Sequence, residues 1–368
     1  MRRRIAVFVT IIQSVLFLGH AFLYETLVAF WRPGQASVWK IQVTLAVLSV
    51  SFVGASLLAF RFANLLVRMF YTLAAMWLGV FSFCFYAACL CWGVSGVAAL
   101  LGLHPHRQSV AAVIFGAALL VSAYGIVNAA LLRVKRVTVK LPNLPESWRG
   151  RVAALVSDTH LGHVRNRGFI RRIVAKLGQL APDIVFIAGD LYDGTAADVK
   201  GLAEPLGKLC PPLGTYFVAG NHEEFSDHTK YLEAVRGAGV RVLNNEKVMV
   251  DGLQLVGVHY RDGTRPERLR PILRRAAVAH ERTSILLNHG PYLLEVAEEE
   301  GISLQLSGHT HGGQFFPYTR IVSRIYGAYA YGLQRFGNMM VYTSCGAGTW
   351  GPPLRVGTSP EIVLIRFE

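Results

Sequence analysis

The chain has 368 residues, enough for two domains, and its 52% hydrophobic content is high for a soluble protein. Its formal net charge of +14 is uneven, because residues 1–135 carry ten Lys/Arg and one acid, whereas the remainder carries 27 Lys/Arg and 22 acids. Most of the positive excess therefore lies in loops beside apolar segments, as membrane topology requires, and we expect no nucleic-acid partner.

Four segments in the first part of the chain are long and apolar enough to cross a bilayer as helices, which takes about 20 residues. They are residues 5–30, 41–60, 69–92 and 109–132. The first is too long for the apolar part of a cleavable signal peptide, and three more spans follow it. Apolar and basic residues then alternate over residues 134–139, which predicts a strand. We therefore predict a transmembrane region at residues 1–135 and a globular domain at residues 136–368.

The positive charges that flank these spans predict the orientation of the chain. One side would hold Arg2, Arg3, Arg4, Arg61, Arg68, Arg133, Lys135, Arg136 and Lys140. The other side would hold only Arg32, Lys40 and Arg107. We expect a multi-pass protein of the cell (inner) membrane, with both termini and the globular domain in the cytoplasm.

A repeated pattern begins at Val152, in which a short apolar run is followed directly by residues that can bind metal ions. The runs are residues 152–156, 184–188, 215–219, 285–287 and 304–306. Their length and bounding turn residues predict buried strands, and periodic segments such as 169–180 and 231–236 predict helices between them. Ligand sites in open α/β sheets collect beyond the carboxyl ends of the strands. We therefore expect an α/β domain in which the five clusters converge on one rim.

The residues after these runs form a donor set suited to two divalent ions. They are Asp158, His160, Asp190, Asn221, His289, His309 and His311. A pair of ions about 3.5–4 Å apart needs one bridging ligand and mixed oxygen and nitrogen ligands around each ion. Asp190 can bridge through its two oxygens, Asn221 offers a carbonyl oxygen, and the histidines offer imidazole nitrogens. Each motif alone is a weak signal, but five of them in order after predicted strands are not expected by chance.

This ordered set resembles the calcineurin-like metallophosphoesterase superfamily over residues 141–368. The Gly-His-Thr-His-Gly-Gly-Gln motif at 308–314 and the stretch 342–355 look closest to a bacterial branch of membrane-associated phosphodiesterases. The resemblance implies an α-β-β-α sandwich of two mixed sheets. It also implies that one ion is held by Asp158, His160, Asp190 and His311. The other ion would be held by Asp190, Asn221, His289 and His309.

Two further positions match the family by motif. His222 corresponds to the family's histidine that is not a metal ligand, and Asp193 corresponds to the acid that pairs with it, so both are expected to be catalytic. The chain departs from the protein Ser/Thr phosphatases at Gly194-Thr195, where those enzymes have Arg-Gly, which argues against a phosphoprotein substrate. A donor set without thiolate suits manganese, iron or zinc.

The prediction is a membrane-anchored hydrolase with two divalent ions that cleaves a phosphodiester or pyrophosphate bond in a nucleotide-linked or lipid-linked substrate. A tethered phosphomonoesterase or cyclic-nucleotide phosphodiesterase is an alternative. A non-catalytic metal-binding membrane sensor is another, which the presence of both His222 and Asp193 argues against. A transporter is disfavoured, because the spans contain no paired charges or internal repeat.

Several residues keep two interpretations. Arg355 is either a bidentate phosphate ligand or a surface arginine. His163 and His259 either touch substrate or belong to polar loops. The basic stretches at 165–172 and 265–275 either face an anionic leaflet or form solvated helix faces. The five cysteines contain no C-x-x-C pair, which predicts free, buried thiols.

Overall fold

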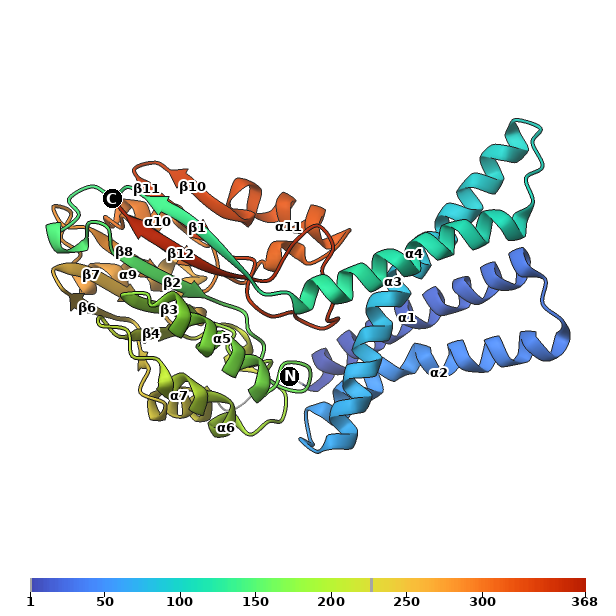
Figure 1. Cartoon of the computed structure of the whole chain (residues 1–368), viewed down its shortest axis with the longest axis horizontal. Helices are drawn as coiled ribbons and strands as arrows, with labels where there is room; N and C mark the ends of the chain where they lie inside the picture. The colour runs from blue at the N-terminus through green and yellow to red at the C-terminus, as the bar shows by residue number, and fades with distance from the viewer. Residues whose placement is uncertain (1, 226–227) are drawn as a thin grey trace. The chain divides into compact units, whose positions relative to one another are not determined.

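The computed structural model describes residues 2–225 and 228–368, and the chain divides into two compact units. The first comprises Met1–Val127 and Gly351–Leu354, and the second comprises Asn128–Trp350 and Arg355–Glu368. Figure 1 labels the helices of the first unit and most strands of the second, and its colours follow the chain from blue to red.

Four long helices make up most of the first unit: α1 (Arg2–Trp31), α2 (Gln35–Ala59), α3 (Leu65–Leu100) and α4 (Arg107–Ala130). All four are long and apolar enough to cross a membrane, which confirms the predicted number of apolar helices. α3 is longer at both ends than the predicted 69–92. Its N-terminus is set by Asn64, whose side-chain oxygen accepts a hydrogen bond from the Val67 amide at 3.0 Å and thereby caps the helix.

Two pairs of polar side chains connect α1 with α3 inside the helical unit. Trp77 donates its indole N–H to Nε2 of His20 at 2.9 Å, and Trp92 donates to the hydroxyl of Thr26 at 3.0 Å. Such pairing is expected within a bilayer, where no water can satisfy a buried polar group. The polar residues of the spans therefore act as contacts between α1 and α3.

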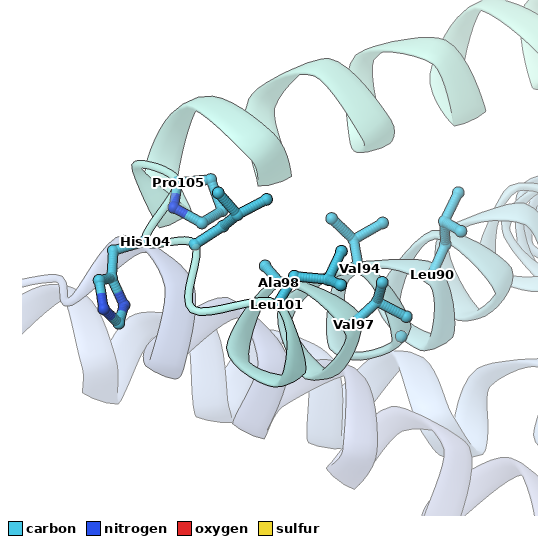
Figure 2. A pocket seen from close by; sticks show the side chains of 9 residues that line it. Leu90, Val94, Val97, Ala98, Leu101, His104 and Pro105 are labelled. Carbon is cyan, nitrogen blue, oxygen red and sulfur yellow. The ribbon is translucent and has the colours of Figure 1, made fainter.

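An apolar pocket of about 750 Å³ lies at the C-terminal end of α3. Figure 2 shows Leu90, Val94 and Val97 of α3 lining it, together with Pro105 from the loop that leads to α4. His104 is the one lining residue with an ionisable side chain. The pocket therefore offers hydrophobic surface suited to acyl chains and no group of side chains that would carry out chemistry.

Two six-stranded mixed sheets form the second unit. The first has the order β1-β12-β2-β3-β4-β5, with β1 (Arg133–Val139), β12 (Glu361–Phe367), β2 (Val152–Val156), β3 (Ile184–Ala188), β4 (Thr215–Val218) and β5 (Arg241–Val242). The second has the order β10-β11-β9-β8-β7-β6, with β10 (Gly332–Phe336), β11 (Met339–Thr343), β9 (Leu304–Ser307), β8 (Ser284–Leu287), β7 (Leu253–Gly257) and β6 (Glu246–Val250). β2 to β5 are parallel, as are β7, β8, β9 and β11, whereas β12 and β2, β6 and β7, and β10 and β11 pair antiparallel.

The alternation of side chains along each strand builds the layers. In β2, Ala153 and Leu155 face the core between the two sheets, whereas Ala154 and Val156 face the helices on the outside. The first sheet is covered by α5 (Arg167–Leu180), α6 (Val199–Ala203) and α7 (His228–Gly237), and the second by α9 (Pro266–Ala276) and α10 (Leu294–Glu299). The predicted α-β-β-α sandwich of two mixed sheets is therefore confirmed.

The remaining short elements lie in the connections. They are α8 (Tyr260–Gly263), α11 (Tyr318–Tyr326), and the 3-10 turns η1 (Glu146–Trp148), η2 (Glu204–Lys208), η3 (His222–Glu224), η4 (His311–Gly313) and η5 (Gly327–Ala330). All five cysteines are free, as predicted, but Cys89 and Cys210 are exposed and so correct the expectation that every thiol is buried.

Candidate metal centre

The seven predicted ligands meet at one rim of the two sheets. Each follows a parallel strand: the loop after β2 carries two of them, the loops after β3, β4 and β8 carry one each, and the loop after β9 carries two. Backbone hydrogen bonds tie the first two loops together, since Asp158 N donates to Gly189 O at 3.0 Å and His160 N donates to Asp190 O at 3.1 Å. The carboxyl ends of parallel strands share an edge, which explains the convergence.

One donor group consists of Asp158, His160 and His311, all of them buried. Nε2 of His160 lies 2.9 Å from Nε2 of His311, and the latter lies 3.6 Å from Oδ1 of Asp158. Metal bonds of about 2.0–2.2 Å place neighbouring ligand atoms about 3 Å or slightly more apart. The spacing of this group therefore fits one divalent ion.

A second donor group consists of Asp190, Asn221, His289 and His309. Nδ1 of His309 lies 2.9 Å from Oδ1 of Asn221 and 3.2 Å from Nε2 of His289. The other ring nitrogen of His289 contacts the Ala188 carbonyl oxygen at 2.7 Å, as a donor N–H does, so that Nε2 is the nitrogen that faces the site and would bind an ion.

Asp190 lies between the two groups. Its Oδ2 is 3.9 Å from Nε2 of His160 in the first group and 3.2 Å from Nε2 of His289 in the second. A single carboxylate within reach of both groups is what a ligand shared by two ions requires.

The backbone at the ligand positions is unusual. Asp158, His160, Asp190, His309 and His311 all have positive φ, between 48° and 72°. A non-glycine residue in the left-handed region costs free energy, and such residues are enriched at functional sites. The strain at these five positions therefore points to a constraint that comes from function rather than from chain folding.

Gly220 explains how the loops after β3 and β4 approach so closely. A Cβ atom at this position would lie 2.1 Å from Oδ1 of Asp190 and 2.6 Å from its amide nitrogen. No side chain can be accommodated at these distances. The glycine before Asn221 is therefore needed to bring Asp190 and Asn221 into one site.

The electrostatics of the site suit a bound cation. Burial lowers the pKa of His309 to about 3 and holds the pKa values of His160 and His311 well below the usual range, so these rings keep their lone pairs. Burial alone would also lower the pKa of His289, but the charges of Asp190 and Asp158 raise it to about 10. The two carboxylates thus attract positive charge to this place, and a divalent ion would supply it.

Glu223 is a buried residue of the site to which the sequence motif gave no role. Its carboxylate accepts hydrogen bonds from the amides of Gly220 at 2.7 Å, Asp190 at 3.0 Å and Tyr192 at 3.0 Å. Burial and the charge of Asp190 raise its pKa to about 7. Glu223 thus connects the loop after β3 to the loop after β4, and its place directly after His222 in the Gly-Asn-His-Glu motif was the available signal.

His222 and Asp193 are in contact, but not as expected. Nδ1 of His222 contacts the main-chain carbonyl oxygen of Asp193 at 2.8 Å, whereas the Asp193 carboxylate accepts from the amide and hydroxyl of Thr195 at 2.8 and 2.5 Å. The ring of His222 is therefore oriented by the backbone, which corrects the expected carboxylate pair. Its Nε2 faces the site, 4.0 Å from Oδ2 of Asp190.

Both interpretations of Arg355 were wrong. Its side chain is fully buried, and its guanidinium donates to the carbonyl oxygens of His311 at 3.0 Å, Cys345 at 2.6 Å and Gly348 at 2.8 Å. It therefore holds the backbone of a ligand loop and is not available to substrate. Burial lowers its pKa from the usual arginine value.

The two additional histidines differ. His163 lies in the loop between β2 and α5, as one of the two interpretations has it, and its side chain is buried there. His259 is the N-cap residue of α8, and its Nε2 lies 2.9 Å from Oε1 of Glu224. Burial lowers the pKa of His259, which favours the neutral ring, so this contact with the carboxylate is not evidence for an ion pair.

Aromatic side chains line the site on two sides, which the sequence analysis missed. Tyr260 and Tyr292 have ring centroids 6.1 and 5.5 Å from that of His309, and the Tyr292 hydroxyl is 3.2 Å from the hydroxyl of Tyr326. Phe225 and Trp350 lie 4.4 and 6.0 Å from the ring of His222. These residues are far apart in sequence, and only Trp350 lies in a stretch, 342–355, that the sequence analysis singled out.

Comparison with known proteins gives a consistent result. The family model described as "Calcineurin-like phosphoesterase" matches residues 152–313. A "Transmembrane protein with metallophosphoesterase domain" of Danio rerio is 36% identical over 281 residues, which cover 71% of this chain and 63% of that relative. The chain thus spans less than two thirds of that relative's length.

Two bacterial relatives are matched over more of their length. An uncharacterized metallophosphoesterase of Campylobacter jejuni is 30% identical over 326 residues, which cover 85% of this chain and 86% of the relative. One of Aquifex aeolicus is 32% identical over 259 residues, which cover 68% of this chain and 97% of the relative. The similarity thus extends well beyond the metal-binding motifs.

Proposed function

Because the chain belongs to the calcineurin-like phosphoesterase family of metal-dependent hydrolases, we propose that it is a membrane-anchored phosphoesterase with two divalent ions. The cleaved bond is a phosphodiester or pyrophosphate bond, in a nucleotide-linked or lipid-linked molecule. The position of Asp190, with one oxygen within reach of both donor groups, is the observation that carries the proposal.

The ligand assignment follows from the two donor groups. Asp158, His160, Asp190 and His311 hold one ion, and Asp190, Asn221, His289 and His309 hold the other. Carboxylate, amide and imidazole donors suit manganese, iron or zinc. When bound, such ions stabilise charge on phosphoryl oxygens and acidify a water molecule that attacks phosphorus.

His222 is proposed to act on the leaving oxygen. With Nδ1 held by the Asp193 carbonyl, Nε2 is directed toward the donor groups and can donate a proton to that oxygen or stabilise its charge. Because Nε2 also lies within reach of Asp190, its role as an acid has to be separated from a role as a ligand by metal analysis.

The anchor is proposed to comprise residues 1–135, and the catalytic domain residues 136–368. Four helices long and apolar enough to cross a membrane support this, as does the name of the Danio rerio relative. The bias of flanking positive charges supports a location in the inner membrane with the catalytic domain in the cytoplasm. A catalytic domain held at the bilayer favours a lipid-linked substrate over a freely diffusing one.

Hydrolysis of bis-p-nitrophenyl phosphate and p-nitrophenyl phosphate by the purified full-length protein in manganese tests the proposal. We expect faster cleavage of the diester, and loss of turnover to the buffer background in Asp190→Ala. Glu233→Ala, which removes an exposed acid on α7, is the matched control and should keep wild-type turnover.

The outcomes separate the functions. Faster cleavage of the monoester than of the diester would show that the protein is a phosphomonoesterase and not a phosphodiesterase. If no turnover above that of Asp190→Ala is found with manganese, iron or zinc, the phosphoesterase proposal is wrong and a non-catalytic role takes its place.

A further inference from the structure

α11 has an apolar surface that the second unit does not cover. All nine residues of this helix are described, and none is buried. Tyr318, Ile321 and Ile325 are 52%, 46% and 66% exposed, and their spacing places them on one side of the helix. Arg320 and Arg324 flank them. We call these five residues the α11 outer face.

The sequence around this face contains basic residues and no acidic ones. Residues 301–360 contain four arginines and no Asp or Glu. Within the described part of the chain, neither Arg320 nor Arg324 forms an ion pair. Exposed apolar residues beside unpaired cations are typical of a helix that lies at the surface of an anionic bilayer.

The two basic stretches singled out in the sequence, residues 165–172 and 265–275, differ from α11. Arg268, Arg270 and Arg274 of α9 pair with Asp262, Glu299 and Glu300 at 3.0, 2.6 and 3.0 Å.

In the other stretch, Arg165 is buried and donates to the Ala129 carbonyl oxygen at 2.7 Å, and Arg167 pairs with Glu204. The other arginines of the two stretches, Arg171, Arg172, Arg265 and Arg275, are exposed. No large hydrophobic side chain is exposed within either stretch, whereas three are exposed on α11, so both stretches are poorer sites for an anionic leaflet than α11.

A short connection joins α4 to the part of the second unit that contains α11. Only Leu131 and Leu132 separate the end of α4 from the start of β1, so Arg133 lies within roughly 10 Å of the helix end. A cavity of about 550 Å³ is lined by Arg133 and Lys135 of β1 and by Thr319 and Ser323 of α11. α11 is therefore a close neighbour of the point where the chain leaves its last apolar helix.

The same helix reaches the metal centre from its inner side. Tyr326, at its last position, has a ring centroid 6.4 Å from that of His309, and its hydroxyl is 3.2 Å from that of Tyr292. The helix also begins only seven residues after the ligand His311. A surface that contacts α11 is thus close to the donor groups.

From these observations we propose that the α11 outer face docks on the anionic leaflet of the bilayer that holds the four apolar helices. Ile321 and Ile325 enter the acyl boundary, and Arg320 and Arg324 contact lipid phosphates. Docking brings the metal centre to the headgroup level, so that phosphoesters of the bilayer reach it directly. This last step rests on the proposed function, whereas the docking itself does not.

Fluorescence quenching in liposomes tests the docking without reference to activity. The full-length protein with Cys89→Ser and Cys210→Ser receives Ile325→Cys, labelled with the fluorophore nitrobenzoxadiazole, and is reconstituted in phosphatidylglycerol and phosphatidylcholine. Spin-labelled lipids should quench position 325 strongly. Met249→Cys is the matched control, since Met249 is 50% exposed on β6, at the other edge of the sheet from β10, and should not be quenched.

Equal quenching at positions 325 and 249 overturns the docking. Protection of position 325 that depends on protein concentration and not on lipid overturns it as well, in favour of a second copy of the chain. Strong quenching at 325 alone supports it, and quenching that weakens in pure phosphatidylcholine supports the role of the arginines.

The substrate step has its own measurement. Ile321→Glu with Ile325→Glu should lower the ratio of turnover on a bilayer phosphodiester to turnover on bis-p-nitrophenyl phosphate at least tenfold, whereas Met249→Glu should leave the ratio unchanged. An unchanged ratio in the double variant contradicts access from the bilayer. If neither substrate is hydrolysed, the proposed function fails, and the fluorescence result still decides the docking.

Discussion

The imidazole of His222 is held at one nitrogen and faces the donor groups with the other. Its Nδ1 is fixed by a backbone carbonyl, which no side-chain substitution at Asp193 removes. The Asp193 carboxylate instead stabilises the turn at Thr195 and accepts from the amide of His163 at 3.3 Å. The two predicted catalytic residues therefore differ in what their side chains contribute.

Replacing His222 by alanine should lower turnover roughly 10²–10⁴-fold while both metal ions stay bound, because a positioned acid is lost and no ligand is removed. Turnover and metal content, measured by elemental analysis on the same sample, check this. Asp193→Asn keeps the main-chain carbonyl that holds His222 and is the matched comparison. It should lower turnover less than His222→Ala does. Turnover of His222→Ala within twofold of wild type contradicts the acid role, and loss of one ion would make His222 a ligand.

Arg355 and Glu223 support the site through hydrogen bonds to the backbone and not through contact with substrate. Arg355 is buried with its guanidinium on three carbonyl oxygens, and Glu223 is buried with its carboxylate on three amides. A buried charge is tolerated when such hydrogen bonds satisfy it. Both residues therefore fix the backbone on which the donor groups stand, the first at His311 and the second at Asp190.

At the level of elements, the site depends on how closely the loops after β3 and β4 approach. The Gly220 amide donates a hydrogen bond to the Glu223 carboxylate. A Cβ atom on Gly220 would collide with Asp190. Parallel strands bring the loops to one edge, but only the missing Cβ lets them touch. The glycine is thus part of the site although it carries no donor.

Gly220→Ala should displace Asp190 and weaken metal binding, on the order of 10–100-fold as for loss of a supporting contact around a ligand. Metal titration of the purified protein, followed by calorimetry, checks this. Gly178→Ala in α5, where a Cβ meets nothing within 4 Å, is the matched control and should bind metal as the wild type does. Wild-type affinity in Gly220→Ala would contradict the steric argument.

On the scale of the whole molecule, the secondary structure of each unit suits the medium that surrounds it. The helices satisfy their backbone internally, as a bilayer demands, and the strands satisfy theirs within two sheets. The second unit also keeps an exposed apolar face on α11. The proposed docking of this face would make the membrane part of the structural context of both units.

The proposed topology predicts which cysteines a membrane-impermeant maleimide can reach in spheroplasts of an expression host. Exposed Cys210 should react only after permeabilisation, because the proposed topology places it in the cytoplasm. Gly34→Cys, in the loop between α1 and α2, should react in intact spheroplasts. Labelling of Cys210 before permeabilisation, with Gly34→Cys protected, would reverse the orientation.

Local sequence pattern was sufficient to predict the four apolar helices and the strands that carry the donor residues. Apolar length specifies the four helices, because crossing hydrocarbon is a property of each segment alone. The runs before Asp158, Asp190, Asn221, His289 and His309 specify strands whose carboxyl ends share a rim, so the seven donor residues meet as expected. These inferences need only neighbours in sequence and one rule of sheet topology.

Only the tertiary structure decided which side chains are buried and which residues from distant parts of the chain become neighbours. Arg355 has the same residue type whether it lies on the surface or under His311, and only the packed loop makes it buried. Tyr326 and Tyr292 become neighbours of His309 only through packing, since α11 contacts η4 in the loop after β9 and Tyr292 lies in the loop after β8. The outer face of α11 is exposed because the sheets already have their helices, and amphipathic periodicity cannot specify which partner will cover an apolar face.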